Sequence, residues 1–162
     1  MLSQSFTYQL ASIAENAVTP AARLLEQRFG LDVHELRVLR LIDDQPGVTF
    51  TSLAQQTRFE RSATSRILSR LVKAGLVERA IDDHDARQFR LRATEAGKAL
   101  RKGADPLSLE IEGLILSALS DAEQLQFRTI LDKLNTWLNV EFIPQLERRF
   151  PEAARKTIKK RA

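Results

Sequence analysis

The sequence predicts a mainly helical protein with one short β-hairpin, and three observations support this. Glycine and proline are sparse, at 6 and 5 of 162 residues, while the common alanine, leucine, arginine and glutamate lose little free energy on entering a helix. Apolar residues recur every three or four positions over most of the chain, which is helical spacing. Between residues 76 and 93 they alternate instead, which is typical of strands.

The first predicted helix covers about residues 5–30, where an apolar stripe has helical spacing. Pro20 lies within this stripe, so we expect a kink or a restart there. A second helix is predicted to begin with a capping box formed by Asp32 and Glu35. It ends at a turn rich in helix breakers, and Thr49 is expected to cap a short third helix.

A fourth helix is predicted from about Arg61 to Ala74, with Gly75 as its stop. Two short strands follow, at residues 76–81 and 88–93, with a polar hairpin tip between them. Three helices followed by a two-stranded hairpin make a winged helix-turn-helix.

The C-terminal part is again helical. Thr94 is expected to cap a helix that reaches about Leu119 and bends near Gly103 and Pro106. Ser120 and Glu123 form a second capping box before the next helix. The apolar stripes at both ends are wider than one short lobe can cover, so we expect a homodimer. The predicted organisation is a single domain over 1–162, with the winged helix-turn-helix at about 32–97, dimerisation helices at about 5–30 and 98–150, and a basic tail at 151–162.

Composition excludes several kinds of site. The chain has no cysteine, so it has no disulfide or thiolate metal ligand, and its two histidines are too few for an imidazole zinc site. We therefore expect no metal or cofactor. No secretory signal and no apolar stretch of the ~20 residues that span a bilayer are visible, which favours a cytoplasmic protein without membrane contact.

Charge is unevenly distributed. Between Arg58 and Lys102 there are 12 basic and six acidic residues, and five more basic residues follow from Arg155 to the end without an acid. Since the net charge is only +4, the rest of the chain is acidic. A basic middle on an acidic frame indicates a polyanionic partner, although scattered solvated charge would also explain it. The tail is either an extra phosphate contact or a solvated end.

The fourth helix has two different faces. At 100° per residue, its apolar side chains gather on one side and its serine and basic side chains on the other. Such a slim, hydrogen-bonding face can enter the major groove of double-stranded DNA, roughly 12 Å wide. The alternative is a serine-rich surface helix with no partner. The predicted DNA contacts from this helix are Arg61, Ser62, Ser65, Arg66, Ser69, Arg70 and Lys73.

The hairpin supplies further arginines. We expect Arg79 and Arg87 to contact DNA, with Arg87 in the minor groove, where negative potential is focused. Asp85 is expected to hold Arg87 in place. Alternatively, Asp85 and Arg87 only pair with each other in an exposed turn, which is worth less than ~1 kcal/mol.

Residues 53–79, the Asp85-x-Arg87 pattern and residues 91–97 together resemble the DNA-binding core and wing of MarR-type (multiple antibiotic resistance regulator) proteins. The resemblance implies a homodimer joined by its terminal helices that binds a pseudo-palindromic operator. It implies that Arg66 and its neighbours read the major groove. It also implies a repressor that a small aromatic or anionic effector releases.

The sequence departs from this family in the turn before the fourth helix. Arg58 stands where the family often has glycine, and Glu60 stands where it often has a serine cap. The family's pockets lie between the DNA-binding lobe and the dimerisation helices, so His34 and Arg37, with Arg40 nearby, are candidates for binding an effector. The alternative is that these residues belong to the surface or to a subunit contact.

Two other classes of function compete with a DNA-binding regulator, namely an enzyme and an architectural or protein-interaction module. No phosphate-binding glycine loop, nucleophile elbow or HExxH motif occurs, so we expect no enzymatic activity. The remaining alternative is an architectural or protein-interaction winged helix without a ligand response.

Overall fold

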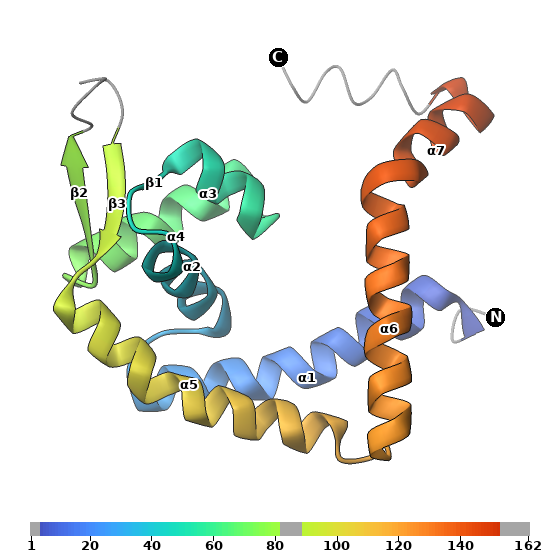
Figure 1. Cartoon of the computed structure of the whole chain (residues 1–162), viewed down its shortest axis with the longest axis horizontal. Helices are drawn as coiled ribbons and strands as arrows, with labels where there is room; N and C mark the ends of the chain where they lie inside the picture. The colour runs from blue at the N-terminus through green and yellow to red at the C-terminus, as the bar shows by residue number, and fades with distance from the viewer. Residues whose placement is uncertain (1–3, 82–88, 153–162) are drawn as a thin grey trace. The chain divides into compact units, whose positions relative to one another are not determined.

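The computed structural model describes residues 4–81 and 89–152, which fall into two compact units divided after Ile115. The first unit (Figure 1) contains most of the elements. They are α1 (Phe6–Phe29), α2 (Val33–Asp44), β1 (Val48–Thr49), α3 (Phe50–Thr57), α4 (Arg61–Lys73), β2 (Val77–Ile81), β3 (Phe89–Ala93) and α5 (Glu95–Leu116). The second unit contains α6 (Asp121–Trp137), the π-helical turn η2 (Leu138–Phe142) and α7 (Ile143–Arg149).

The predicted winged helix-turn-helix is confirmed, with a small difference in its sheet. Strands β2 and β3 form the antiparallel hairpin, with Glu78 opposite Arg92. A third strand, β1, pairs with β3 through Val48 and Leu91, so the strand order is β1-β3-β2. We did not predict β1, because a strand of two residues is too short to show an alternating pattern.

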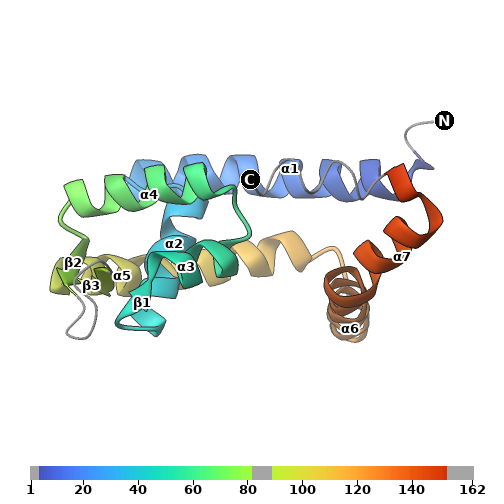
Figure 2. The ribbon, with the colours of Figure 1, turned by 90° about the horizontal axis from the view of Figure 1, so that it is seen from above.

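Helix α2 forms the centre of the first unit. It lies between α4 and α5 in both views (Figures 1 and 2). Its Val38, Leu39 and Ile42 are fully buried in one core cluster with residues of α3, α4 and the sheet. Its Leu36 belongs to a second cluster with Leu25 of α1 and Ala104 of α5. Helix α2 thus contributes to both clusters, and through the first of them it packs against α4.

The start of α5 is fixed against the wing. The Thr94 hydroxyl donates to the Gly75 carbonyl at 2.7 Å and accepts from the Gly97 amide at 3.1 Å, so the predicted cap is confirmed. A Cβ added at Gly97 would lie 2.2 Å from the Leu76 carbonyl oxygen. Only glycine allows this close approach between helix and wing.

Both predicted capping boxes are present. Asp32 accepts from the Glu35 amide, and Glu35 accepts from the Asp32 amide. Ser120 and Glu123 make the equivalent pair of bonds at the start of α6. Hydrogen bonds from the side chain and then the backbone of Ser120 lower the pKa of Glu123. The two boxes differ in burial, because Glu35 is buried whereas Glu123 is exposed.

Both prolines lie inside continuous helices. Helix α1 continues through Pro20, so the restart that was one of our two expectations there is wrong. Helix α5 contains Pro106 and continues to Leu116, close to the predicted end. A proline removes one hydrogen bond of a helix, and packing of the flanking turns can compensate for that loss.

Arg58 ends α3 in the left-handed conformation, at a φ of 58°, the one positive φ of a non-glycine residue among the described parts of the chain. Because a side chain in this region costs ~1–2 kcal/mol, Arg58→Gly is expected to raise the free energy of unfolding by about 0.5–1 kcal/mol after the entropy that glycine gains in the unfolded chain is subtracted. Urea titrations check this. Arg58→Ala is the control, since it also removes the side chain but keeps the strain, and an equal gain in both variants would contradict the account.

Candidate nucleic-acid interface

Helix α4 presents one face to the core and the opposite face to solvent. Thr64, Leu68 and Leu71 are buried on the inner face. The helix begins at Glu60 without a side-chain cap, as its weak capping ability suggested. The residues that the sequence assigned to the outer face are all exposed, namely Arg61, Ser62, Ser65, Arg66, Ser69, Arg70 and Lys73.

A buried pair of hydroxyl groups closes the turn between α3 and α4. The Thr57 and Thr64 side-chain oxygens are 3.1 Å apart, and both residues are buried. Thr57 also donates to the Ala54 carbonyl at 3.2 Å. These bonds hold the turn where the side chain of Glu60 provides no cap. Helical spacing could not predict this pair, because its two members lie on different helices.

The first turn of α4 is also fixed by a cation–π contact. The Arg61 guanidinium carbon lies 4.9 Å from the centre of the Phe50 ring, at the start of α3. Such contacts contribute about 0.5–1 kcal/mol at exposed sites. Arg61 therefore has a structural partner at the edge of the predicted DNA-contacting face.

Arg70 has a partner as well. Its Nε lies 2.9 Å from Oε1 of Glu35, and the two side chains are 62% and 2% exposed respectively. The pair joins α4 to the first turn of α2. We predicted Glu35 only as a capping residue and did not expect its contact with α4.

The wing carries one described candidate. Arg79 is exposed on β2, opposite Leu91 of β3. Arg90 of β3 donates through Nη1 to the carbonyl of Gly47, just before β1, at 3.2 Å. The predicted contacts Asp85 and Arg87, at the hairpin tip, lie outside the described residues.

A mostly apolar cavity of about 190 Å³ lies within the first unit, between α1, α2 and α5. Its charged lining residues are Arg37, Arg40 and Glu112. His34 is not among its lining residues. Instead, the His34 ring meets the Phe59 ring edge-on at 5.0 Å, and the Arg37 guanidinium lies 5.7 Å from the same ring. The apolar walls are formed by Ala17, Val18, Ala21, Leu25, Val33, Ile111 and Ile115.

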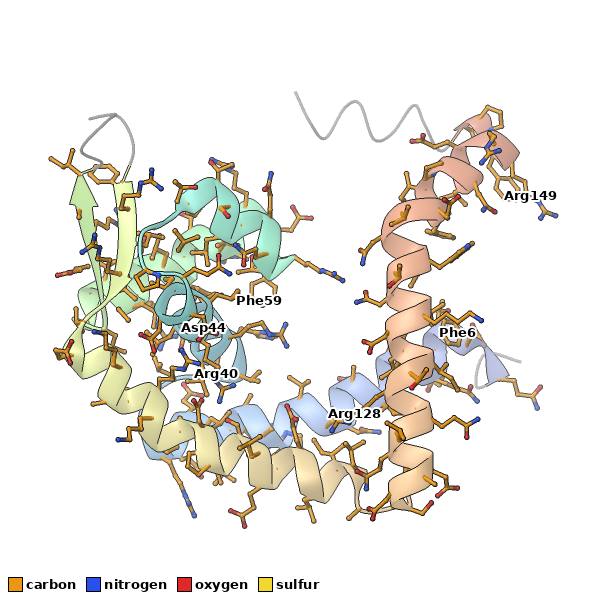
Figure 3. The ribbon with its side chains drawn as sticks, viewed as in Figure 1. Phe6, Arg40, Asp44, Phe59, Arg128 and Arg149 are labelled. Carbon is orange, nitrogen blue, oxygen red and sulfur yellow. The ribbon has the colours of Figure 1, made fainter. Side chains whose placement is uncertain are left out.

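Arg40, which is labelled in Figure 3, lines this cavity and is anchored by residues of α5. Its Nε donates to Asp105 at 2.7 Å and its Nη2 donates to Ser108 at 2.8 Å. Arg101 continues the network to Asp43 at 2.9 Å and Asp44 at 2.6 Å. Burial lowers the pKa of Arg101, but the hydrogen bonds that it donates to Asp44 and Asp43 outweigh burial and raise this pKa above the ordinary value.

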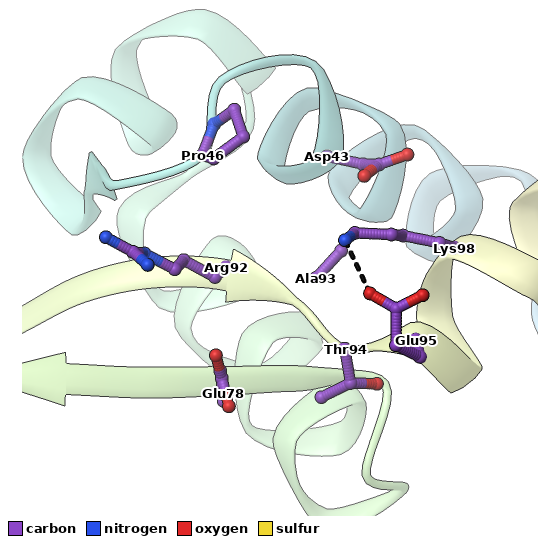
Figure 4. A pocket seen from close by; sticks show the side chains of 8 residues that line it. All are labelled: Asp43, Pro46, Glu78, Arg92, Ala93, Thr94, Glu95 and Lys98. Atoms are coloured by element: carbon purple, nitrogen blue, oxygen red, sulfur yellow. Dashed lines mark hydrogen bonds and ion pairs between the residues drawn. The ribbon is translucent and has the colours of Figure 1, made fainter.

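A second cavity, of about 360 Å³, lies at the base of the wing (Figure 4). Its wall carries three carboxylates and two cations, and Lys98 is bound to Glu95 at 2.7 Å, which raises the pKa of the lysine. This mixture of charges, with one carboxylate in excess, does not favour an anionic ligand. Its lining residues are Asp43, Pro46, Glu78, Arg92, Ala93, Thr94, Glu95 and Lys98.

Within residues 4–81 and 89–152, no helix is long and apolar enough to cross a membrane. In the same ranges, no group of three or more potential metal-binding side chains comes together.

A helix-turn-helix whose last helix exposes serine and arginine side chains, followed by a hairpin wing, defines a winged-helix DNA-binding protein. Residues 29–88 match the model of the MarR family. The match covers 60 of the 162 residues and includes the whole helix-turn-helix, so this part of the chain is similar to the MarR family. The chain is a transcriptional regulator.

Individual relatives agree with this assignment. An HTH-type transcriptional repressor of Mycobacterium tuberculosis is 26% identical over 129 residues, which cover 80% of this chain and 90% of the relative. The structure of the Staphylococcus aureus MepR–DNA complex aligns with a TM-score of 0.74 at 24% identity, covering 82% of this chain and 97% of that one. A M. tuberculosis MarR-family protein in complex with p-aminosalicylic acid aligns with a TM-score of 0.66 at 24% identity, covering 81% and 98%.

Proposed function

We propose that the protein is a homodimeric repressor that binds a pseudo-palindromic operator and is released by a small aromatic acid. The observation that carries this proposal is the outer face of α4, whose inner face is buried in the core. The exposed side chains on this outer face include Ser62, Ser65, Arg66 and Ser69. Since the partner is chromosomal DNA, we place the protein in the cytoplasm. We expect no catalytic activity.

The outer face of α4 suits the major groove. Short serine side chains let the helix approach the base edges closely, while Arg66 can form two hydrogen bonds to one guanine. The wing arginines Arg79 and Arg87 would then lie over the backbone and the minor groove. The solved MepR relative is described as a complex with DNA, which supports the same partner here.

The terminal helices support a dimer. No residue of α6 is buried, although the helix carries a stripe of large apolar side chains that includes Phe127, Ile130 and Leu131. Helix α1 also exposes Phe6 and Ile13. Soluble monomers rarely leave so much apolar surface in contact with water. A second copy of the chain would cover it and would bring two α4 helices to the two half-sites of an operator.

The proposed operator contact is tested by fluorescence anisotropy over a series of salt concentrations. The probes are duplexes upstream of the protein's own gene and scrambled versions of them. We expect binding to the specific duplex to be at least ~10³-fold tighter than to the scrambled one. Equal, weak and salt-sensitive binding to both would instead favour an architectural winged helix.

The cavity beside Arg37 suits a small aromatic carboxylate. Its apolar walls can enclose a ring, and the guanidinium of Arg37 can bind the carboxylate, whereas Arg40 is already paired with Asp105. The relative bound to p-aminosalicylic acid is described with a ligand of this chemistry. We therefore expect p-aminosalicylate to release the protein from its operator.

Arg37→Ala is expected to raise the concentration of p-aminosalicylate needed for release roughly tenfold, since a charge-assisted hydrogen bond contributes ~1.5–3 kcal/mol. Release is measured by anisotropy on the preformed complex. Arg23→Ala removes an exposed arginine of α1 that does not line the cavity and serves as the control. Equal release of both variants would show that the acid acts elsewhere.

A further inference from the structure

The carboxylate of Glu35 is buried and uses both of its oxygens. Oε2 accepts from the Asp32 amide at 3.1 Å, within the capping box of α2. Oε1 lies 2.9 Å from Nε of Arg70, on α4. Glu35 is only 2% exposed, whereas most of the Arg70 side chain is in contact with water. One side chain therefore links the first turn of α2 to the helix that carries Arg66.

Capping does not explain why Glu35 is buried. The other capping box of the chain has the same chemistry, and its glutamate, Glu123, is exposed. Removing a carboxylate from water costs several kcal/mol unless a partner compensates for it. At Glu35 that partner is Arg70. This capping box therefore also binds a second helix, α4, which the exposed capping box does not do.

The other directional contacts of α4, from Thr64 to Thr57 and from Arg61 to Phe50, hold only its first turn, and they hold it against α3. Further along the helix the support is apolar. Leu68 and Leu71 pack into the core on the inner face of the helix, and apolar contacts of this kind tolerate small rotations. A hydrogen-bonded ion pair requires both a distance and an angle. The contact between Glu35 and Arg70 therefore limits rotation of α4 about its own axis.

We propose that Glu35 and Arg70 set the rotation of α4 on α2 and thereby the sequence discrimination of the protein, and that Arg70 is a positioning residue. Arg66 precedes Arg70 by one helical turn on the same side of α4, so any rotation moves both. The inference rests on the proposed function, in which Arg66 contacts base edges. It differs from the expectation that Arg70 contacts the DNA directly, for example at a phosphate.

The two roles predict different measurements. A phosphate contact contributes to the binding of every duplex. Its loss therefore lowers the salt slope, which is the steepness with which the logarithm of the affinity falls with the logarithm of the salt concentration, by about 1. The preference between sequences stays unchanged. A positioning pair changes the preference and leaves the salt slope unchanged. Removing Glu35 separates the roles, because a buried carboxylate does not touch a phosphate.

The test uses the full-length wild type and the variants Glu35→Gln, Arg70→Gln and the double variant. Each is titrated by anisotropy with the best duplex selected from a random pool by the wild type, and with a scrambled version. Each single variant is expected to lower the ratio of the two affinities roughly tenfold, and the double variant no further, because the residues act as a pair.

Two further variants keep the result interpretable. Arg70→Lys preserves the charge but not the Nε geometry, so it is expected to lose discrimination like Arg70→Gln. Lys102→Gln removes an exposed cation of α5, outside the predicted DNA contacts and outside the pair, and it is expected to keep the ratio. Thermal unfolding of each variant checks that it is folded at the assay temperature.

A ratio unchanged by Glu35→Gln would overturn the inference, as would a lower salt slope with an unchanged ratio in Arg70→Gln. In both cases the proposed function stands, because the wild type still discriminates. If the wild type itself binds both duplexes equally, the proposed function fails and this inference fails with it.

Discussion

Leu131→Glu is expected to dissociate the dimer and to weaken operator binding by at least about 100-fold, because only one half-site is then held at a time. Leu131 lies in the apolar stripe of α6 and is 37% exposed in the single chain. In a dimer interface its substitute would be a buried carboxylate without a partner, which is costly.

Sedimentation equilibrium and anisotropy measure the two effects. Lys133→Glu adds a carboxylate on the opposite side of the same helix and serves as the control, since it should leave the dimer intact. A dimeric Leu131→Glu protein that still binds its operator tightly would show that this stripe is covered in another way.

Arg66→Ala is expected to weaken operator binding by ~1–3 kcal/mol and to relax base preference at one position of each half-site. Arg66 lies in the middle of the exposed face of α4, flanked by Ser62, Ser65 and Ser69. Its loss should therefore remove contacts to base edges and leave the backbone contacts in place.

Selection of random duplexes by the Arg66→Ala protein, together with anisotropy, tests this expectation. Lys102→Ala, on the exposed side of α5, is the matched control for the loss of one positive charge. An equal loss of affinity for operator and scrambled DNA would indicate that Arg66 contacts only the backbone.

The fold could be predicted largely because local patterns determine its elements. Asp32, Ser120 and Thr94 signalled three helix starts through short-range hydrogen bonds that depend on residues within one turn. The elements that sequence reasoning missed depend on tertiary contacts instead. Strand β1 exists because Val48 pairs with β3, and α1 remains continuous at Pro20 although local rules favour a break.

The exposed face of α4 could also be predicted, because helical spacing places Arg66 and the serines on one side. The contacts that hold this helix could not. Arg70 meets Glu35, Arg61 meets Phe50, and both partners lie on other helices. A spacing pattern along the chain describes neighbours within one helix and says nothing about partners on another.

The central claim is that the outer face of α4 enters the major groove in both subunits of a dimer. Because the chain has no cysteine, Ser65→Cys gives a single attachment point for an iron–EDTA reagent, which cleaves nearby DNA. The account predicts two symmetric groups of cuts, about 10 base pairs or a multiple of that apart, and none from the same reagent at Glu110→Cys on α5. Cuts from Glu110→Cys alone, or a single unpaired group from Ser65→Cys, would contradict it.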